Sequence, residues 1–114
     1  MDRKTGITFG DFMKLDIRVG EILEAKVFER AKKPSYKLVV DFGEAIGKKQ
    51  SSAQITEHFT PEGLIGRQVL AVVNFPPRNI AGFLSEVLVL GTYSEGGVVL
   101  ISPAKKVKPG DILG

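Results

Sequence analysis

The residue types that could do chemistry are few in this chain. It has one histidine, His58, and no cysteine. A histidine metal cluster needs more than one imidazole and a thiolate site needs cysteine, so neither metal-binding pattern is present. A serine triad would have to use His58 alone, and its neighbours Phe59 and Pro61 favour a surface or packing role for it.

Two other segments resemble catalytic motifs only in part. Gly43–Lys49 (GEAIGKK) has one residue too few between its glycines for a phosphate loop, and a lysine stands where magnesium needs a hydroxyl. Glu86 follows Ser85, but a general-acid mechanism needs a partner group and the sequence names none. We therefore expect that the chain is not an enzyme and uses no cofactor and no metal.

The residues best suited to bind a ligand form one stretch, Asn74–Phe83 (NFPPRNIAGF). Its two prolines fix backbone angles, and it places two phenylalanines beside an arginine and two amides. A rigid loop with apolar and cationic groups side by side is typical of a binding site. The alternative is an ordinary loop whose phenylalanines cap the core.

Positive charge is concentrated in the first half of the chain. The net charge is +3, from 16 basic and 13 acidic residues. Residues 26–49 include only three acidic residues. The basic residues of this range are Lys26, Arg30, Lys32, Lys33, Lys37, Lys48 and Lys49. Such a cluster attracts phosphate or acidic segments, or else forms a solvated face.

Two apolar runs, Val69–Val73 and Val87–Leu90, must hold the candidate binding loop. Both are of strand length, and neither alternates apolar with polar residues, which predicts strands covered on both faces. The second cover is most simply another copy of the chain, so we expect a homodimer. The expected interface uses Leu88 and Leu90, or else Val87 and Val89, and also Phe9, Phe12, Ile112 and Leu113.

Other segments predict the surrounding elements. Thr8 and Asp11 form a capping pattern, which predicts a short helix that covers one end of a barrel. Leu15–Gly20 alternates and then changes phase, which predicts a bulge or bend at Gly20. We also expect strands at Tyr36–Gly43 and Lys48–Ile55, a helical turn near Leu64 and Ile65, and turns at Ser94–Gly97 and Pro109-Gly110.

Short strands separated by turn residues indicate an all-β fold. Five strands with one helical connection after the third favour a five-stranded OB-fold barrel with a short N-terminal helix and a C-terminal extension. We expect one domain, 1–114. The first residues (MDRKTGITFGDFMK) lack the apolar core of a signal peptide, and no apolar run approaches the roughly 18 residues of a membrane span, so we expect a cytoplasmic protein without membrane insertion.

Several of these segments are similar to a known family. Leu15–Gly20, Val69–Val73 and Ser85-Glu86 resemble the tRNA-binding OB domain that is appended to methionyl- and phenylalanyl-tRNA synthetases. Within that family, Lys49–Thr56 and Asn74–Gly91 resemble the CsaA-like bacterial secretion chaperones. The resemblance implies a homodimer that binds presecretory proteins, and it implies contact with the SecA translocase motor.

The sequence departs from the tRNA-binding pattern at two places. Val87-Leu88 follows Ser85-Glu86 where the family usually has Gly-Met, and Pro76-Pro77 stands where tRNA binders tend to carry lysine. Both changes replace polar or flexible positions with apolar or rigid ones. They favour a groove for unfolded polypeptide over a tRNA site.

Three functions remain open at this point. The first is an ATP-independent chaperone that binds unfolded or presecretory polypeptides and supports protein export, with a site formed by Phe75, Pro76, Pro77, Arg78, Ile80, Phe83, Lys48 and Lys49. The second is a tRNA- or RNA-binding module, with a site formed by Lys33, Tyr36, Lys37, Lys48, Lys49, Arg78 and Ser85. Phe42 is a further stacking candidate, although the apolar run Leu38–Val40 before it favours a core position. The third is a dimeric structural partner with no ligand of its own.

Overall fold

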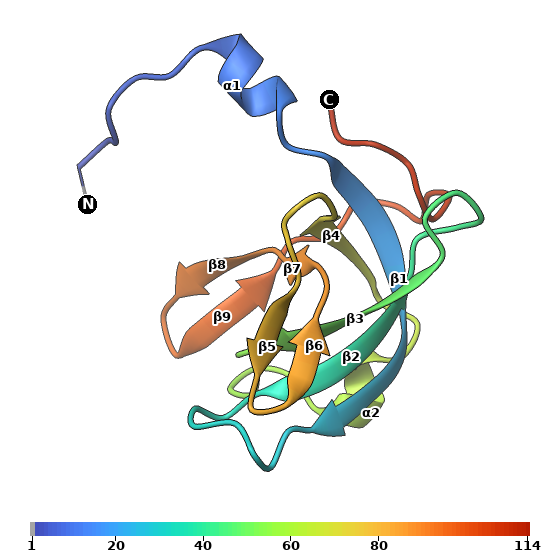
Figure 1. The fold of residues 1–114 in the computed structure, drawn as a ribbon. Coiled ribbons are helices and arrows are strands. Elements are labelled where there is room, and N and C mark those ends of the chain that lie inside the picture. Colours follow the sequence, from blue (N-terminus) through green and yellow to red (C-terminus); the bar gives the residue numbers. More distant parts are fainter. Residues whose placement is uncertain (1) are drawn as a thin grey trace.

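The structure is a computed structural model that describes residues 2–114, and its regular elements are mainly strands (Figure 1). The main sheet has the order β3-β2-β1-β4-β7, with every neighbouring pair antiparallel. Its strands are β1 (Ile17–Val27), β2 (Tyr36–Asp41), β3 (Lys48–Ala53), β4 (Gln68–Val72) and β7 (Leu88–Val89). This sheet nearly closes into a barrel, which confirms the expected OB fold.

Smaller elements complete the structure. The two helices are α1 (Phe9–Met13) and α2 (Pro61–Leu64), and α2 is the expected helical turn after the third strand. Two separate two-stranded sheets are formed by β5 (Arg78–Ile80) with β6 (Phe83–Ser85), and by β8 (Gly91–Ser94) with β9 (Gly97–Leu100). No helix within residues 2–114 is long and apolar enough to cross a membrane.

The interior of the barrel follows from the alternation of strand side chains. In β2, Tyr36, Leu38 and Val40 are buried and the residues between them are half-buried. Phe42 is 1% exposed and belongs to the same core. Its role as a stacking candidate for RNA bases was therefore wrong, because the strand alternation points its ring inward.

A bulge or bend was expected at Gly20, but this residue lies in a part of the β1 ladder without a register shift. It pairs with Val69 in the ladder, and the register shift falls between Ile22 and Glu24. A Cβ atom at Gly20 would lie 2.4 Å from Val40 Cγ1 and 2.7 Å from Phe42 Cε1. The glycine thus serves close packing inside the barrel.

Side chains help close the barrel between β3 and the segment that leads to β7. The Gln50 N–H donates to Glu86 Oε1 (3.0 Å), and the Glu86 N–H donates to the Gln50 carbonyl (2.8 Å). The Ser51 hydroxyl donates to the Val87 carbonyl at 2.9 Å. The Ser85-Glu86 pair, which resembles the tRNA-binding family, therefore helps to join the two ends of the sheet, β3 and β7.

Helix α1 does not cover the barrel as expected. The capping box is present, since the Asp11 N–H donates to Thr8 Oγ1 (3.2 Å) and the Thr8 N–H donates to Asp11 Oδ2 (3.0 Å). None of its residues is buried, and Phe9 is 75% exposed. The helix stands away from the barrel, at the end of the molecule where the C-terminus also lies (Figure 1).

The C-terminal extension follows the first half of β1. The Val19 N–H donates to the Asp111 carbonyl and the Leu113 N–H donates to the Ile17 carbonyl, both at 2.9 Å. Arg18 and Ile112 form an isolated antiparallel bridge between these bonds. The tail thereby extends the sheet at the edge of β1 that β2 leaves free.

The two apolar runs differ in how the chain covers them. In β4, Val69, Ala71 and Val72 are all buried and Leu70 is half-buried. The expectation that a second copy must cover one whole face of this strand was therefore wrong, because the chain covers both faces itself. In the second run Val87 is buried, whereas Leu88 is 46% exposed, so Leu88 remains a predicted partner contact.

Candidate functional site

The candidate binding stretch contains a β-hairpin, where the sequence had suggested a rigid loop. Strands β5 and β6 pair in the register Arg78–Ser85 and Ile80–Phe83. The two turn residues, Ala81 and Gly82, both have positive φ angles, 49° and 85°. A two-residue turn of this kind matches the twist of the flanking strands. The β5–β6 hairpin is thus a regular element that carries the predicted residues.

Aromatic packing fixes this hairpin on the barrel. The ring of Phe83 lies edge-on to that of Phe28, with centroids 5.4 Å apart and planes at 65°. Lys37 Nζ lies 5.5 Å from the Phe28 centroid and 5.7 Å from the Phe83 centroid. Edge-to-face rings and a cation over their faces are both favourable arrangements. Phe83 therefore anchors the hairpin while its own side chain is half-buried.

The segment before the hairpin is held at its start and exposed along its length. The Asn74 side chain accepts a hydrogen bond from the Asp16 N–H (2.9 Å) and donates one to the Lys14 carbonyl (2.8 Å). Phe75 is 45% exposed, and Pro76, Pro77 and Arg78 are exposed as well. We call residues 75–78 the exposed segment. It presents an aromatic ring, two prolines and a guanidinium group from a backbone fixed at both ends.

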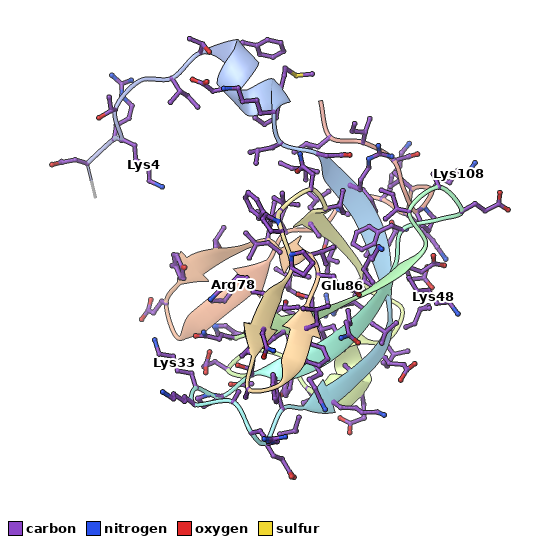
Figure 2. The ribbon with its side chains drawn as sticks, viewed as in Figure 1. Lys4, Lys33, Lys48, Arg78, Glu86 and Lys108 are labelled. Carbon is purple, nitrogen blue, oxygen red and sulfur yellow. The ribbon has the colours of Figure 1, made fainter. Side chains whose placement is uncertain are left out.

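The structure separates the two predicted lysines from this segment. Lys48 begins β3, opposite Asp41, and Lys49 is half-buried next to it. Figure 2 shows Arg78 and Lys48 on different sides of the β5–β6 hairpin. Ile80 is half-buried on the hairpin itself. The coherent part of the predicted polypeptide site therefore consists of the exposed segment, Ile80 and Phe83.

Two residues of the predicted RNA site are buried and form hydrogen bonds within the protein. Tyr36 is 7% exposed, and its hydroxyl donates to the Phe59 carbonyl at 2.7 Å. Ser85 is buried, and its Oγ accepts the Ser52 N–H at 3.0 Å. Stacking on Tyr36 and ligand binding by Ser85 were therefore wrong expectations. The four lysines of this set remain at least partly accessible, and they are Lys33, Lys37, Lys48 and Lys49.

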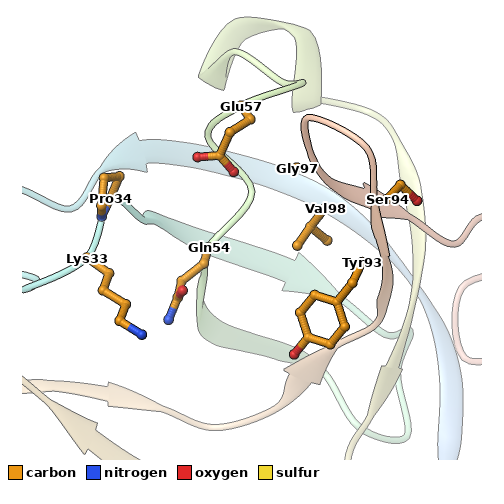
Figure 3. Close-up of a pocket in the computed structure, with 8 residues that line it drawn as sticks. All are labelled: Lys33, Pro34, Gln54, Glu57, Tyr93, Ser94, Gly97 and Val98. Atoms are coloured by element: carbon orange, nitrogen blue, oxygen red, sulfur yellow. The ribbon is translucent and has the colours of Figure 1, made fainter. Parts of the chain in front are cut away.

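Sequence reasoning missed two features near the site. Lys26 and Lys37 are direct cross-strand neighbours, and with Phe83, Glu24, Leu38 and Val39 they line a cavity of about 140 Å³. A second cavity of about 340 Å³ lies against the β8–β9 hairpin (Figure 3). Each cavity is formed by segments that are far apart in the sequence, so no local sequence pattern predicts it.

The predicted interface residues are largely accessible in the single chain. Phe9 is 75% exposed, Ile112 64%, Leu88 46% and Leu113 39%, and Phe12 and Leu90 are half-buried. Exposed apolar side chains of this size are often found at protein contacts. Phe9 and Ile112 come from opposite ends of the sequence, and both lie at the end of the barrel that α1 and the C-terminal tail share.

Two ionisable groups have clearly shifted pKa values, and both lie outside the β5–β6 hairpin. Hydrogen bonds from the Thr8 backbone and from Lys14 lower the pKa of Asp11 below its usual value of 3.8. A hydrogen bond to Asp16 raises the pKa of Arg18. Within residues 2–114 no group of three or more His, Asp or Glu side chains could hold a metal ion.

Comparison with known families and structures identifies the fold family. The family model described as "Putative tRNA binding domain" matches residues 17–112. The chain belongs to this family. Among solved structures, the chain is similar to a CsaA chaperone protein from Picrophilus torridus, with 51% identity and a TM-score of 0.91 over 96% of this chain and 100% of that one.

A CsaA chaperone from Bacillus anthracis is 48% identical, with a TM-score of 0.90 and the same coverage. The resemblance to CsaA-like proteins within the tRNA-binding family is thus confirmed. A methionine–tRNA ligase from Archaeoglobus fulgidus is 37% identical over 110 residues, which is 96% of this chain. That match covers only 16% of the ligase, so the chain spans about a sixth of the length of the curated relatives it matches.

Proposed function

We propose that this protein is an ATP-independent chaperone that binds unfolded or presecretory polypeptides as a homodimer and supports protein export from the cytoplasm. The observation that carries the proposal is the exposed segment, residues 75–78, with Phe75 45% exposed beside two exposed prolines and Arg78. The likeness to two CsaA chaperone structures over 96% of the chain supports the same function.

The chemistry of the exposed segment suits an unfolded chain. Phe75 and the two prolines offer apolar surface to side chains that a folded protein would bury. Arg78 offers a cation to acidic side chains and backbone carbonyls. Because Asn74 and Phe83 fix the two ends, little conformational entropy is lost when a polypeptide binds.

Binding of this kind needs no nucleotide. A protein that binds the unfolded state shifts the equilibrium away from aggregation by mass action alone. In this proposal SecA is the partner that receives presecretory chains.

The proposed dimer uses the apolar surface at the α1 end of the barrel. Its contacts are Phe9, Phe12, Leu88, Leu90, Ile112 and Leu113. Phe9 and Ile112 expose most of their surface in the single chain, and burial of such side chains contributes roughly 1.5–3 kcal/mol each. Two copies would place two exposed segments in one particle, which strengthens capture of long polypeptides.

RNA binding is the second candidate, favoured by the family match over residues 17–112. Lys33, Lys48 and Arg78 are exposed and could contact phosphates. The site lacks the aromatic stacking that Tyr36 and Phe42 were expected to supply, since both rings are buried. Binding through phosphates alone would depend steeply on salt.

Fluorescence anisotropy distinguishes the two functions. The probes are a reduced, carboxymethylated polypeptide, which cannot fold, and bulk tRNA, each measured from about 50 to about 500 mM salt. We expect polypeptide binding that changes less than tenfold over this range and that weakens at least tenfold in Phe75→Ser. Ile65→Ser is the matched control, because Ile65 is 50% exposed at the end of α2. Tight tRNA binding with no polypeptide binding would contradict the proposal.

A further inference from the structure

Strand β8 forms a free sheet edge on the surface. The β8–β9 sheet has only these two strands, and all four residues of β8 are exposed. Tyr93, in the middle of β8, is 95% exposed. An edge strand offers a row of unpaired backbone groups to any extended chain that comes alongside it.

The ladder determines which backbone groups of β8 face outward. The turn closes at the pair Ser94–Gly97, and hydrogen-bonded and non-hydrogen-bonded pairs alternate along an antiparallel ladder. Ser94–Gly97 and Thr92–Val99 are therefore the hydrogen-bonded pairs. The Tyr93 N–H and carbonyl point away from β9, and neither meets a backbone partner elsewhere in residues 2–114.

This edge carries none of the usual protection against pairing. Its sequence, Gly91-Thr92-Tyr93-Ser94, has no charge and no proline, and its ladder has no register shift. The hairpin is nevertheless held in place. The Ile101 N–H donates to the Leu90 carbonyl at its base (3.2 Å), and His58 Nε2 lies 3.1 Å from the Glu95 carbonyl at its tip.

A cavity of about 340 Å³ adjoins the same strand (Figure 3). Tyr93 and Val98, which are cross-strand neighbours, form one wall, and Lys33, Pro34, Gln54 and Glu57 form much of the rest. Neither Lys33 nor Glu57 forms an ion pair within residues 2–114. The cavity therefore combines apolar surface with an amide and with a cation and a carboxylate that form no ion pair within the described residues.

We propose that β8 is a second polypeptide-binding site, at which an extended segment adds to the sheet edge and places a side chain in this cavity. The Tyr93 N–H and carbonyl would pair with the backbone of the incoming segment, and alternate side chains would reach the cavity. Lys33 and Glu57 offer a cation and a carboxylate to a polar side chain there. The inference rests on the proposed chaperone function and adds a surface to it.

Polypeptide suits this surface better than RNA does. A row of outward N–H and carbonyl groups matches another peptide backbone, whereas a nucleic acid strand has no matching series of donors. The Glu57 carboxylate in the cavity also repels phosphate. The occupant we infer is therefore an extended polypeptide segment.

Proline at position 93 tests the inference. Because the Tyr93 N–H faces outward, Tyr93→Pro removes an edge donor and leaves the hairpin bonds of Thr92 and Ser94 intact. Tyr93→Thr keeps the N–H and is the matched control for loss of the ring. We expect Tyr93→Pro to weaken binding of the carboxymethylated polypeptide at least tenfold, Tyr93→Thr less than threefold, and Lys33→Glu at least threefold.

Amide hydrogen exchange of the unaltered protein gives an independent readout. Addition of the polypeptide should slow exchange of the Tyr93 amide at least tenfold. Equal binding by Tyr93→Pro and the unaltered protein, with no slowing at Tyr93, would overturn the β8 site and leave the chaperone function standing. Absence of any polypeptide binding would overturn both. If exchange of the Tyr93 amide slows only with rising protein concentration, the edge pairs with a second copy of the chain, and the inference is overturned. Slower exchange with tRNA but not with polypeptide would overturn it as well.

Discussion

Phe83 packs edge-on against Phe28, with ring centroids 5.4 Å apart, and this contact joins the β5–β6 hairpin to the end of β1. The hairpin therefore does not move independently of the barrel. The hairpin is also bonded to β3, where the Gln50 side chain donates to the Leu84 carbonyl (2.8 Å) and the Ser52 N–H donates to Ser85 Oγ (3.0 Å). The aromatic contact acts with these bonds to position the exposed segment.

Loss of this contact should loosen the hairpin. Phe83→Ala removes the edge-to-face pair and the ring under Lys37, and we expect a loss of about 1–3 kcal/mol in the free energy of unfolding, measured by urea denaturation. Polypeptide affinity should fall as well, because the exposed segment is no longer held at its far end. Phe83→Leu is the control that keeps apolar volume. Equal affinity of Phe83→Ala and the unaltered protein would contradict the role of the hairpin.

Gly20 should tolerate no side chain. Gly20→Ala places a Cβ atom 2.4 Å from Val40 Cγ1, so the core must shift, and we expect a destabilisation of about 1–3 kcal/mol by urea unfolding. Gly6→Ala is the matched control, because nothing lies within 4 Å of its Cβ position. Similar unfolding midpoints for the two variants would show that the barrel does not pack as described.

The dimer should depend on the apolar side chains at the α1 end. Sedimentation of the unaltered protein at micromolar concentration should give twice the 12.4 kDa chain mass. The double variant Phe9→Ser/Ile112→Ser should sediment at the mass of one chain, because it removes two exposed apolar contacts. Ile65→Ser should leave the dimer intact. A single-chain mass for the unaltered protein would refute the proposed interface.

The α1 cap should weaken in acid. The pKa of Asp11 is lower in the folded state than its usual value of 3.8, because its carboxylate accepts the Thr8 N–H. A lowered folded-state pKa means that the cap stabilises the helix above the unfolded pKa and loses this effect as pH falls through the folded value. The Thr8 amide proton shift, followed by NMR, should therefore titrate with a midpoint below 3.8. Asp11→Asn should abolish that titration, and a midpoint above this value would contradict the capping box.

Local patterns were sufficient to predict much of the fold. The capping box at Thr8 and Asp11 involves residues three apart, and the Ser94–Gly97 turn closes between adjacent strands. Both features depend only on residues that are close in the sequence, so the sequence alone predicts them. Phe42 was expected in the core as well as considered for stacking, and its apolar neighbours in β2 favoured the answer that the structure gives.

Features that depend on distant residues could not be predicted. The β5–β6 hairpin has three-residue strands after two prolines and a turn residue, Ala81, with φ of 49°, so its sequence resembles a loop. The burial of Tyr36 depends on its hydroxyl reaching the Phe59 carbonyl, 23 positions away. The cavity beside Tyr93 forms only when segments from three parts of the chain meet.

Site-specific crosslinking tests the central proposal, that the exposed segment binds unfolded polypeptide. The photoreactive residue p-benzoylphenylalanine would replace Phe75 in one variant and Ile65 in another, each irradiated with the carboxymethylated polypeptide and tRNA together. The account predicts crosslinks to polypeptide from position 75, retained at about 500 mM salt, and few from position 65. Equal crosslinking from both positions, or crosslinks from position 75 to tRNA alone, would contradict it.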